Sequence, residues 1–202
     1  KKKFDQLCDA TGISFHRVTD GILHVFTKPA ELEHAKRQAE FQEKFGCHED
    51  ILSADQCRRI EPALDYAGQT IVGGIHAPLD ESGNAHQFSL ELQRICEAEL
   101  GVVFHFNTEI TGFKTEQDRI TAVTTNKGDL TADRYVLSLR SYSSVLLAKL
   151  GLNVPIYPMK GYSVTLPANT FSPKMSLTDQ QAKIVYSRFG DKLRVAGTAE
   201  FA

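Results

Sequence analysis

The sequence predicts a mixed fold of the α+β or α/β type. Amphipathic helical patterns such as residues 86–100 alternate with short apolar runs bounded by turn residues. No Gly-x-Gly-x-x-Gly follows any of these runs, and the pair Gly73–Gly74 stands alone. The central stretch, residues 134–166, reads as strand, serine-rich turn, helix and strand, which predicts a crossing between two domains.

Within this central stretch, Val136 to Leu139 is an apolar run that predicts a buried strand. The serines at 141–144 end that run and open a short helix, and Gly151 provides its C-cap. Tyr157 to Leu166 predicts a long strand whose beginning Pro155 and Pro158 confine to an edge position.

The first part of the chain predicts a helix closed by Gly12 and then a hairpin over residues 13–27, turning at Asp20–Gly21. Thr27 is the predicted N-cap of a helix over residues 30–45. Ser53-x-x-Gln56 is a capping-box pattern for a short helix that Pro62 stops.

The second part predicts a strand at 70–76, then a helix over 86–100 that ends at Gly101. The residues expected to face inward on that helix are Phe88, Leu92, Ile95, Cys96 and Leu100. Further strands are predicted at 102–106, in a meander at 109–115, 119–126 and 129–132, and in a hairpin of 184–187 with 193–199.

Composition narrows the classes of function. A net charge of −2 gives no electrostatic case for nucleic-acid binding. The histidines and the four cysteines show no metal-ligand spacing and no Cys-x-x-Cys pair, which favours reduced structural thiols and no metal site. No apolar stretch has the length of a membrane span, and no signal-peptide pattern occurs.

Three spaced motifs carry a resemblance to a known family. They are Pro78-Leu79-Asp80-Glu81-Ser82-Gly83, the run Tyr157 to Pro167 preceded by Leu139-Arg140-Ser141-Tyr142-Ser143, and Ser187 to Asp191 followed by Arg194 to Glu200. In this order they resemble the small subunit of D-amino acid dehydrogenase, a flavin enzyme of the glycine oxidase and D-amino acid oxidase superfamily. The likeness covers nearly the whole chain, which we interpret as the central fragment of a longer protein.

The resemblance implies a division into domains. Residues 1–76 and 152–202 are expected to be two parts of a substrate-binding domain with a mixed or antiparallel sheet and flanking helices. Residues 77–151 are expected to be a partial FAD-binding domain that lacks its glycine-rich βαβ unit.

The resemblance also implies an activity. The full-length enzyme would use FAD to deaminate D-amino acids oxidatively to 2-oxo acids and ammonia, with a respiratory electron acceptor. The fragment alone is expected to be inactive, with no catalytic side chain of its own, and to self-associate through bare strand edges in 102–139. The expected location is the cytoplasm, and the resemblance allows peripheral association with the inner face of the cell membrane.

Site residues follow by resemblance alone. Ile110, Ser138, Leu139 and Ser141 match positions near the cofactor, although a core position is an alternative for Ile110. Arg140 stands where the family ordinarily has glycine. The substrate-facing candidates are Arg188, Tyr162 and Glu200, with solvent exposure the alternative for Arg188 and packing the alternative for Tyr162.

Two other functions stay open from the sequence. One is a related flavin amine oxidase that acts on glycine, sarcosine or proline, because the scaffold is shared and the Gly-x-Arg-Pro motif that usually carries the carboxylate-binding arginine does not occur in these residues. The other is a non-catalytic binding domain.

Overall fold

The computed structural model describes residues 2–201, which fall into two compact units. The described residues up to 101 together with Gly161–Ala199 form the first unit, and Val102–Lys160 with residues 200 and 201 form the second. These boundaries differ from the domain limits predicted at residues 76/77 and 151/152, because the helix over 85–100 clusters with the first unit.

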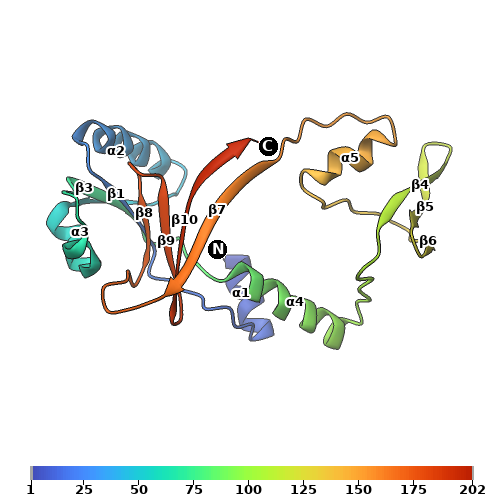
Figure 1. The fold of residues 1–202 in the computed structure, drawn as a ribbon, viewed down its shortest axis with the longest axis horizontal. Helices are drawn as coiled ribbons and strands as arrows, with labels where there is room; N and C mark the ends of the chain where they lie inside the picture. Colours follow the sequence, from blue (N-terminus) through green and yellow to red (C-terminus); the bar gives the residue numbers. More distant parts are fainter. Residues whose placement is uncertain (1, 202) are drawn as a thin grey trace. The chain divides into compact units, whose positions relative to one another are not determined.

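A mixed seven-stranded sheet with the order β2-β3-β1-β8-β9-β10-β7 organises the first unit (Figure 1). Its strands are β1 (Ile22–Phe26), β2 (Asp50–Ser53), β3 (Gly73–Ala77), β7 (Met159–Pro167), β8 (Ser176–Asp179), β9 (Ile184–Phe189) and β10 (Lys192–Phe201). The pair β1·β8 is parallel, whereas β1·β3, β2·β3, β8·β9 and β9·β10 are antiparallel. The expected mixed sheet with flanking helices is therefore confirmed.

The helices of the first unit are α1 (Lys2–Thr11), α2 (Pro29–Glu43), α3 (Ala54–Ile60) and α4 (Ala85–Leu100), and a 3₁₀ helix, η1, spans Pro62–Tyr66. Side chains alternate between the two faces of a sheet. One face packs Leu23, Val25 and Leu177 against Cys57 of α3 and Leu64 of η1. The other face packs Phe26 and Ile75 against Leu32 of α2. The sheet thus has helices on both faces at its β1–β3 end.

Two of the sequence motifs serve this packing. The capping box at α3 is confirmed: Ser53 Oγ accepts from the Gln56 N–H at 3.3 Å, and Gln56 Oε1 accepts from the Ser53 N–H at 2.8 Å. The Pro78–Gly83 motif holds a loop. Glu81 accepts a hydrogen bond of 2.6 Å from Arg17 Nε, and a Cβ on Gly83 would lie 2.6 Å from the ring of Phe15.

A buried carboxylate ties distant parts of the first unit together. Glu61 is 1% exposed, and Oε1 accepts the Ala63 N–H at 3.1 Å at the start of η1. Its Oε2 accepts the N–H groups of Lys174 at 2.8 Å and Met175 at 3.1 Å, just before β8. Glu61 therefore fixes the position of the segment that leads into the middle of the sheet.

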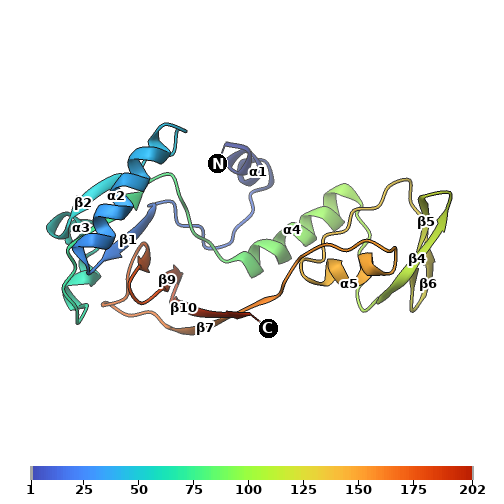
Figure 2. The ribbon, with the colours of Figure 1, turned by 90° about the horizontal axis from the view of Figure 1, so that it is seen from above.

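The second unit contains a three-stranded antiparallel meander and one short helix. The strands are β4 (Ile110–Glu116), β5 (Arg119–Thr125) and β6 (Gly128–Leu130), and the helix is α5 (Tyr142–Ala148). Figure 2 shows the three strands side by side. The predicted meander is confirmed, with β6 ending at Leu130 rather than at 132.

One predicted hairpin and two predicted strands are wrong. Residues 13–27 do not form a hairpin: β1 begins at Ile22 and pairs with β3 and β8, and Val18 makes only an isolated bridge to Ser82. Gly21, at φ +84°, lets β3 approach so closely that a Cβ would lie 2.3 Å from His76 Nε2. Residues 102–106 and 136–139 have no strand structure, because no described neighbour pairs with them.

Helix ends differ in smaller ways. The N-cap of α2 is Lys28, not Thr27, and the helix ends at Glu43. In α4, Ile95 is buried as predicted, but Leu100, the last residue of the helix, is 72% exposed, and Gly101 follows it as the C-cap in the left-handed conformation. Among the described helices, none combines the length and the apolar character needed to cross a membrane.

Candidate functional site

The face of β9, β10 and β7 that lies opposite Leu177 and Tyr186 carries an open cavity. In the register, Ser187 pairs with Arg194 and Val185 with Ala196, so these four residues share one face. The cavity is open, has a volume of about 630 Å³ and is lined by Gly161, Tyr162, Ser163, Lys183, Val185, Arg194 and residues 196–199. Such a volume accommodates a small organic molecule.

Arg194 is the polar group best placed to hold an anion in this cavity. Its Nη2 donates a hydrogen bond of 3.0 Å to Ser163 Oγ on the neighbouring strand, which steadies the guanidinium. The other guanidinium N–H groups are available for a planar, bidentate contact with a carboxylate. Lys183 adds a second positive charge to the lining. The arrangement can therefore bind and orient a small carboxylate.

The predicted substrate residues lie in different places. Tyr162 lines this cavity. Glu200 forms an ion pair of 3.4 Å with Lys160, so its charge is partly neutralised. Arg188 pairs with Leu193, one position out of step with Arg194, and therefore projects from the opposite sheet face, where its Nε donates to the Gly190 carbonyl at 3.1 Å.

Sequence reasoning placed Arg194 on the hairpin that resembles the substrate-facing strands but did not select it as a site residue, and it did not consider Ser163. The signal that would have found Arg194 is strand alternation across the predicted hairpin, which separates Arg188 from Arg194 once the turn is placed at residues 190 and 191. Ser163 becomes visible only through the pairing of β7 with β10, two strands whose adjacency no local pattern indicates.

In the second unit, Ile110 is the first residue of β4 and pairs with Thr125. It is half-buried and lines a cavity of about 280 Å³ together with Val123, Thr125 and Tyr135. This cavity is apolar, and a flat ring could occupy it. The contact of Ile110 with a cofactor stays a prediction.

Ser138, Leu139 and Ser141 lie in the extended segment and turn that lead into α5. The Leu139 N–H donates to Ser143 Oγ at 3.2 Å, and the Leu139 carbonyl accepts the Tyr142 N–H at 3.1 Å. Ser141 is the N-cap residue of α5 but makes no side-chain cap. The turn is thus held by its own hydrogen bonds, and the cofactor contacts of these residues also stay predictions.

Arg140 lies in the middle of this turn with φ +52°, in the left-handed region that favours glycine. The backbone thus has the shape that glycine would adopt without strain, and Arg140 adds to it a Cβ and a positively charged guanidinium. The close approach of a pyrophosphate to bare backbone that a glycine permits is therefore not provided at this turn.

The glycine pair at the start of β3 serves packing instead of ligand binding. A Cβ on Gly73 would lie 2.7 Å from the Leu52 carbonyl, and one on Gly74 would lie 2.7 Å from both Cys57 Sγ and the His24 carbonyl. At both glycines, the space that a side chain would need is occupied by other atoms of the protein. Within residues 2–201 we find no glycine-rich strand-to-helix turn that fits the pyrophosphate of FAD.

The cysteine and histidine side chains near the core take part in packing and hydrogen bonding within the protein. All four cysteines are free, and Cys57 is fully buried, which raises the pKa of its thiol to about 11. Burial lowers the pKa of His24, whose Nδ1 lies 2.9 Å from Gln180 Nε2. Among the described residues there is no cluster of histidine, cysteine or carboxylate ligands arranged for a metal ion.

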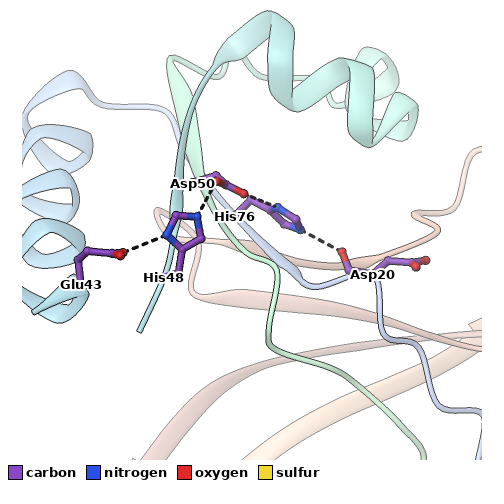
Figure 3. A network of polar contacts seen from close by, with 5 residues as sticks. All are labelled: Asp20, Glu43, His48, Asp50 and His76. Atoms are coloured by element: carbon purple, nitrogen blue, oxygen red, sulfur yellow. Dashed lines mark hydrogen bonds and ion pairs between the residues drawn. The ribbon is translucent and has the colours of Figure 1, made fainter. Parts of the chain in front are cut away.

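A chain of polar contacts links the end of α2 to the sheet edge (Figure 3). His48 lies between two carboxylates: its Nδ1 is 3.0 Å from Glu43 Oε2, and its Nε2 is 3.2 Å from Asp50 Oδ1. Asp50 also contacts His76 Nδ1 at 3.4 Å, and His76 Nε2 donates to the Asp20 carbonyl at 3.0 Å. The pKa of His48 is raised above its ordinary value of 6.5, first by the hydrogen bond to Glu43 and then by the negative charge of Glu43. The hydrogen bond to Asp50 and the charge of Asp50 contribute less.

The raised pKa of His48 predicts a stability that depends on pH. The contribution of protonated His48 to the free energy of unfolding is fully present below about pH 6.5, the pKa of this side chain in the unfolded chain. It is lost as the pH rises through the higher pKa of the folded protein. His48→Gln should therefore lower the melting temperature at pH 5.5 and have less effect at pH 8.5. Thermal unfolding of both proteins across this range, in low salt, measures the difference. His34→Gln, an exposed histidine on α2, is the control, and a difference that grows with pH would contradict the assignment.

The comparison with protein families finds a match over the whole chain. The model described as "FAD dependent oxidoreductase" (DAO) matches residues 1–202. A D-amino acid dehydrogenase of Granulibacter bethesdensis is 42% identical over 198 residues, which are 97% of this chain and 47% of that protein. A D-amino acid dehydrogenase of Paramagnetospirillum magneticum is 43% identical over 194 residues, or 95% of this chain and 46% of that protein. The chain spans about half the length of the curated relatives it matches.

Solved structures share the fold. An L-proline dehydrogenase from P. horikoshii matches with a TM-score of 0.84 and 21% identity, over 96% of this chain and 52% of that one. A glycine oxidase from Geobacillus kaustophilus gives the same TM-score and identity, over 98% and 52%. At this identity the likeness concerns the arrangement of the backbone.

Proposed function

The chain belongs to the DAO family of FAD-dependent oxidoreductases, and from this premise we propose that the whole protein is a D-amino acid dehydrogenase. The observation that carries the proposal is the identity of 42–43% with two proteins of that name over nearly all of this chain. The proposed reaction oxidises a D-amino acid to an imino acid, which water hydrolyses to a 2-oxo acid and ammonia. The electrons pass to a respiratory acceptor.

We assign separate roles to the two units within this proposal. The first unit provides the substrate-binding part, with the cavity of β9, β10 and β7 holding the amino acid. The second unit belongs to the FAD-binding part, with Ile110, Ser138, Leu139 and Ser141 near the cofactor. FAD supplies the hydride-accepting chemistry when it is bound. Because the described residues contain no glycine-rich strand-to-helix turn for the pyrophosphate, we expect residues 1–202 alone to be inactive.

In this proposal Arg194 binds the substrate carboxylate and Tyr162 covers the apolar side of the cavity. A bidentate contact fixes two atoms of the substrate, which restricts how the α-carbon can face the rest of the site. The open cavity leaves the amino acid side chain room, so the carboxylate contact contributes more to binding than side-chain selection does.

The test uses the full-length protein with D-alanine and a dye as electron acceptor. Arg194→Ala should raise KM at least tenfold, as expected for loss of a charge-assisted contact worth roughly 1.5–3 kcal/mol. The matched control is Arg188→Ala, on the opposite sheet face, which should leave KM within about twofold. A large effect at Arg188 and none at Arg194 would restore the sequence-based assignment.

The alternative is a flavin oxidase acting on glycine, sarcosine or proline, which the shared fold of the solved structures keeps open. Peroxide formation from these substrates, without turnover of D-alanine, would favour it. A full-length protein that binds no flavin would favour a non-catalytic binding domain.

Peripheral attachment to a membrane is a further part of the proposal, and co-sedimentation of the full-length protein with vesicles tests it.

Self-association of residues 1–202 is also proposed. Val103 and Val136 are 74% and 89% exposed in extended segments that pair with no described strand. Such apolar edges invite pairing with another copy. Light scattering should therefore detect dimers or larger species, and Val103→Lys with Val136→Lys should shift the population to monomer. Leu79→Lys, an exposed apolar residue of the first unit, is the control. A monomeric parent protein would contradict the proposal.

A further inference from the structure

A second cavity lies on the other face of the sheet, behind the candidate substrate site. Tyr186 pairs with Leu177 and alternates with Val185, so it faces away from the cavity that contains Arg194. This second cavity has a volume of about 370 Å³ and is bounded by the sheet, by η1 with the segment up to Ile71, and by residues 169–173. It lies entirely in the first unit.

The walls of the second cavity are mainly apolar. Val25, Leu64, Ile71, Leu177 and Leu193 contribute to its lining. Tyr66 and Phe171 also line it. These two rings are 66% and 57% exposed, and their centroids lie 4.8 Å apart in an edge-to-face contact. An aromatic pair that is in contact and yet exposed can cover a ligand without closing the opening.

The polar end of the cavity is acidic. Asp179 is 5% exposed, and among the described residues that line the cavity it is the one with a formal charge at neutral pH. Its Oδ1 accepts the N–H groups of Gln181 and Ala182, both at 2.9 Å, and its Oδ2 accepts from Gln69 Nε2 at 2.6 Å. These contacts hold the carboxylate in one orientation.

The two neighbours of Asp179 add to the same preference. Because Gln69 uses its Nε2 group to donate to Asp179, its amide oxygen is the atom left to accept from a ligand. The Tyr186 hydroxyl can accept as well, and burial together with the charge of Asp179 raises the pKa of this phenol. The cavity therefore combines an apolar body with an end that calls for hydrogen-bond donors and positive charge.

We propose that this second cavity binds a small organic amine, with its apolar body between η1 and the sheet and its ammonium group at Asp179, Gln69 and Tyr186. A carboxylate at that end would face Asp179 and be repelled. The site thus selects amines without a carboxylate, in contrast to the amino acid proposed for the Arg194 cavity. Neither cavity depends on the other for its chemistry, so this inference is independent of the proposed D-amino acid oxidation.

The experiment titrates the purified protein with benzylamine, benzyl alcohol and benzoate, each followed by calorimetry. The three molecules have similar bodies and differ in the charge of the head. Benzylamine should bind at least tenfold more tightly than benzyl alcohol, and benzoate should not bind detectably. Equal binding of the three, or preference for benzoate, would overturn the proposal.

Variants locate the binding. Ala67→Leu reduces the cavity volume at its wall, and Tyr186→Phe removes one hydroxyl at its polar end. The first should abolish benzylamine binding, and the second should weaken it about threefold to tenfold. Thr198→Val, in the cavity on the other sheet face, is the control and should leave binding unchanged.

Circular dichroism verifies the fold of each variant. If Ala67→Leu does not fold, Ala63→Leu at the same wall takes its place. Binding that survives in folded variants of the wall would refute the site.

Discussion

Replacing Glu61 with alanine is expected to lower the free energy of unfolding by about 3 kcal/mol. The carboxylate is buried and accepts three backbone N–H groups, from Ala63, Lys174 and Met175. Its removal leaves these donors without their partner inside the protein, and each such loss is costly. Urea denaturation followed by circular dichroism measures the difference.

Two further variants sharpen the interpretation of Glu61. Glu61→Gln keeps the shape but turns an amide N–H₂ group toward backbone donors, so it should lose about 2 kcal/mol. Glu33→Ala is the control, because Glu33 is exposed and pairs only with Lys36 on the surface of α2, a contact worth about 0–0.5 kcal/mol. A loss below about 1 kcal/mol for Glu61→Ala would mean that water replaces the carboxylate easily.

Gly74→Ala is expected to cost about 2–3 kcal/mol. The added Cβ would lie 2.7 Å from Cys57 Sγ and 2.7 Å from the His24 carbonyl, so both α3 and β1 would have to move. The matched control is Gly68→Ala, since nothing lies within 4 Å of a Cβ at that position. Chemical denaturation of the two variants should separate them clearly.

A double variant tests the cause of the Gly74 effect. Cys57→Ala with Gly74→Ala removes the sulfur but leaves the backbone clash with His24, so it should not restore the stability of the parent protein. The coupling between the two substitutions should nevertheless be measurable, because the residues are in contact. Full additivity would show that α3 does not rest on Gly74.

Local signals predicted the elements whose stability is local. The capping box of Ser53 and Gln56, the end of α4 at Gly101 and the hairpin of β9 and β10 each depend on residues close in sequence. The meander of β4 to β6 belongs to the same group. For these elements, the turn and cap residues determine the geometry before any distant contact is made.

Elements that depend on distant partners were missed. Asp20–Gly21 is a strong hairpin signal, but Gly21 is needed for the approach of His76, which lies far away in the sequence. The apolar runs at 102–106 and 136–139 have strand composition but no described strand beside them. For the candidate site, Tyr162 was predicted from the sequence and lines the cavity, while its role stays a prediction; the choice of Arg194 over Arg188 required the register of β9 and β10.

The parallel pairing of β1 with β8 has a consequence for biosynthesis. Ile22 aligns with Ser176, so the central strands of the sheet come from opposite ends of this chain. A ribosome that has released β1 to β3 must still deliver the meander and α5 before β8 can join them. Contacts of such long sequence separation slow folding, because chain entropy is lost before the contacts form. The edge of β1 that later pairs with β8 therefore stays unpaired until β8 has been synthesised. The need for chaperones should be greatest during that interval.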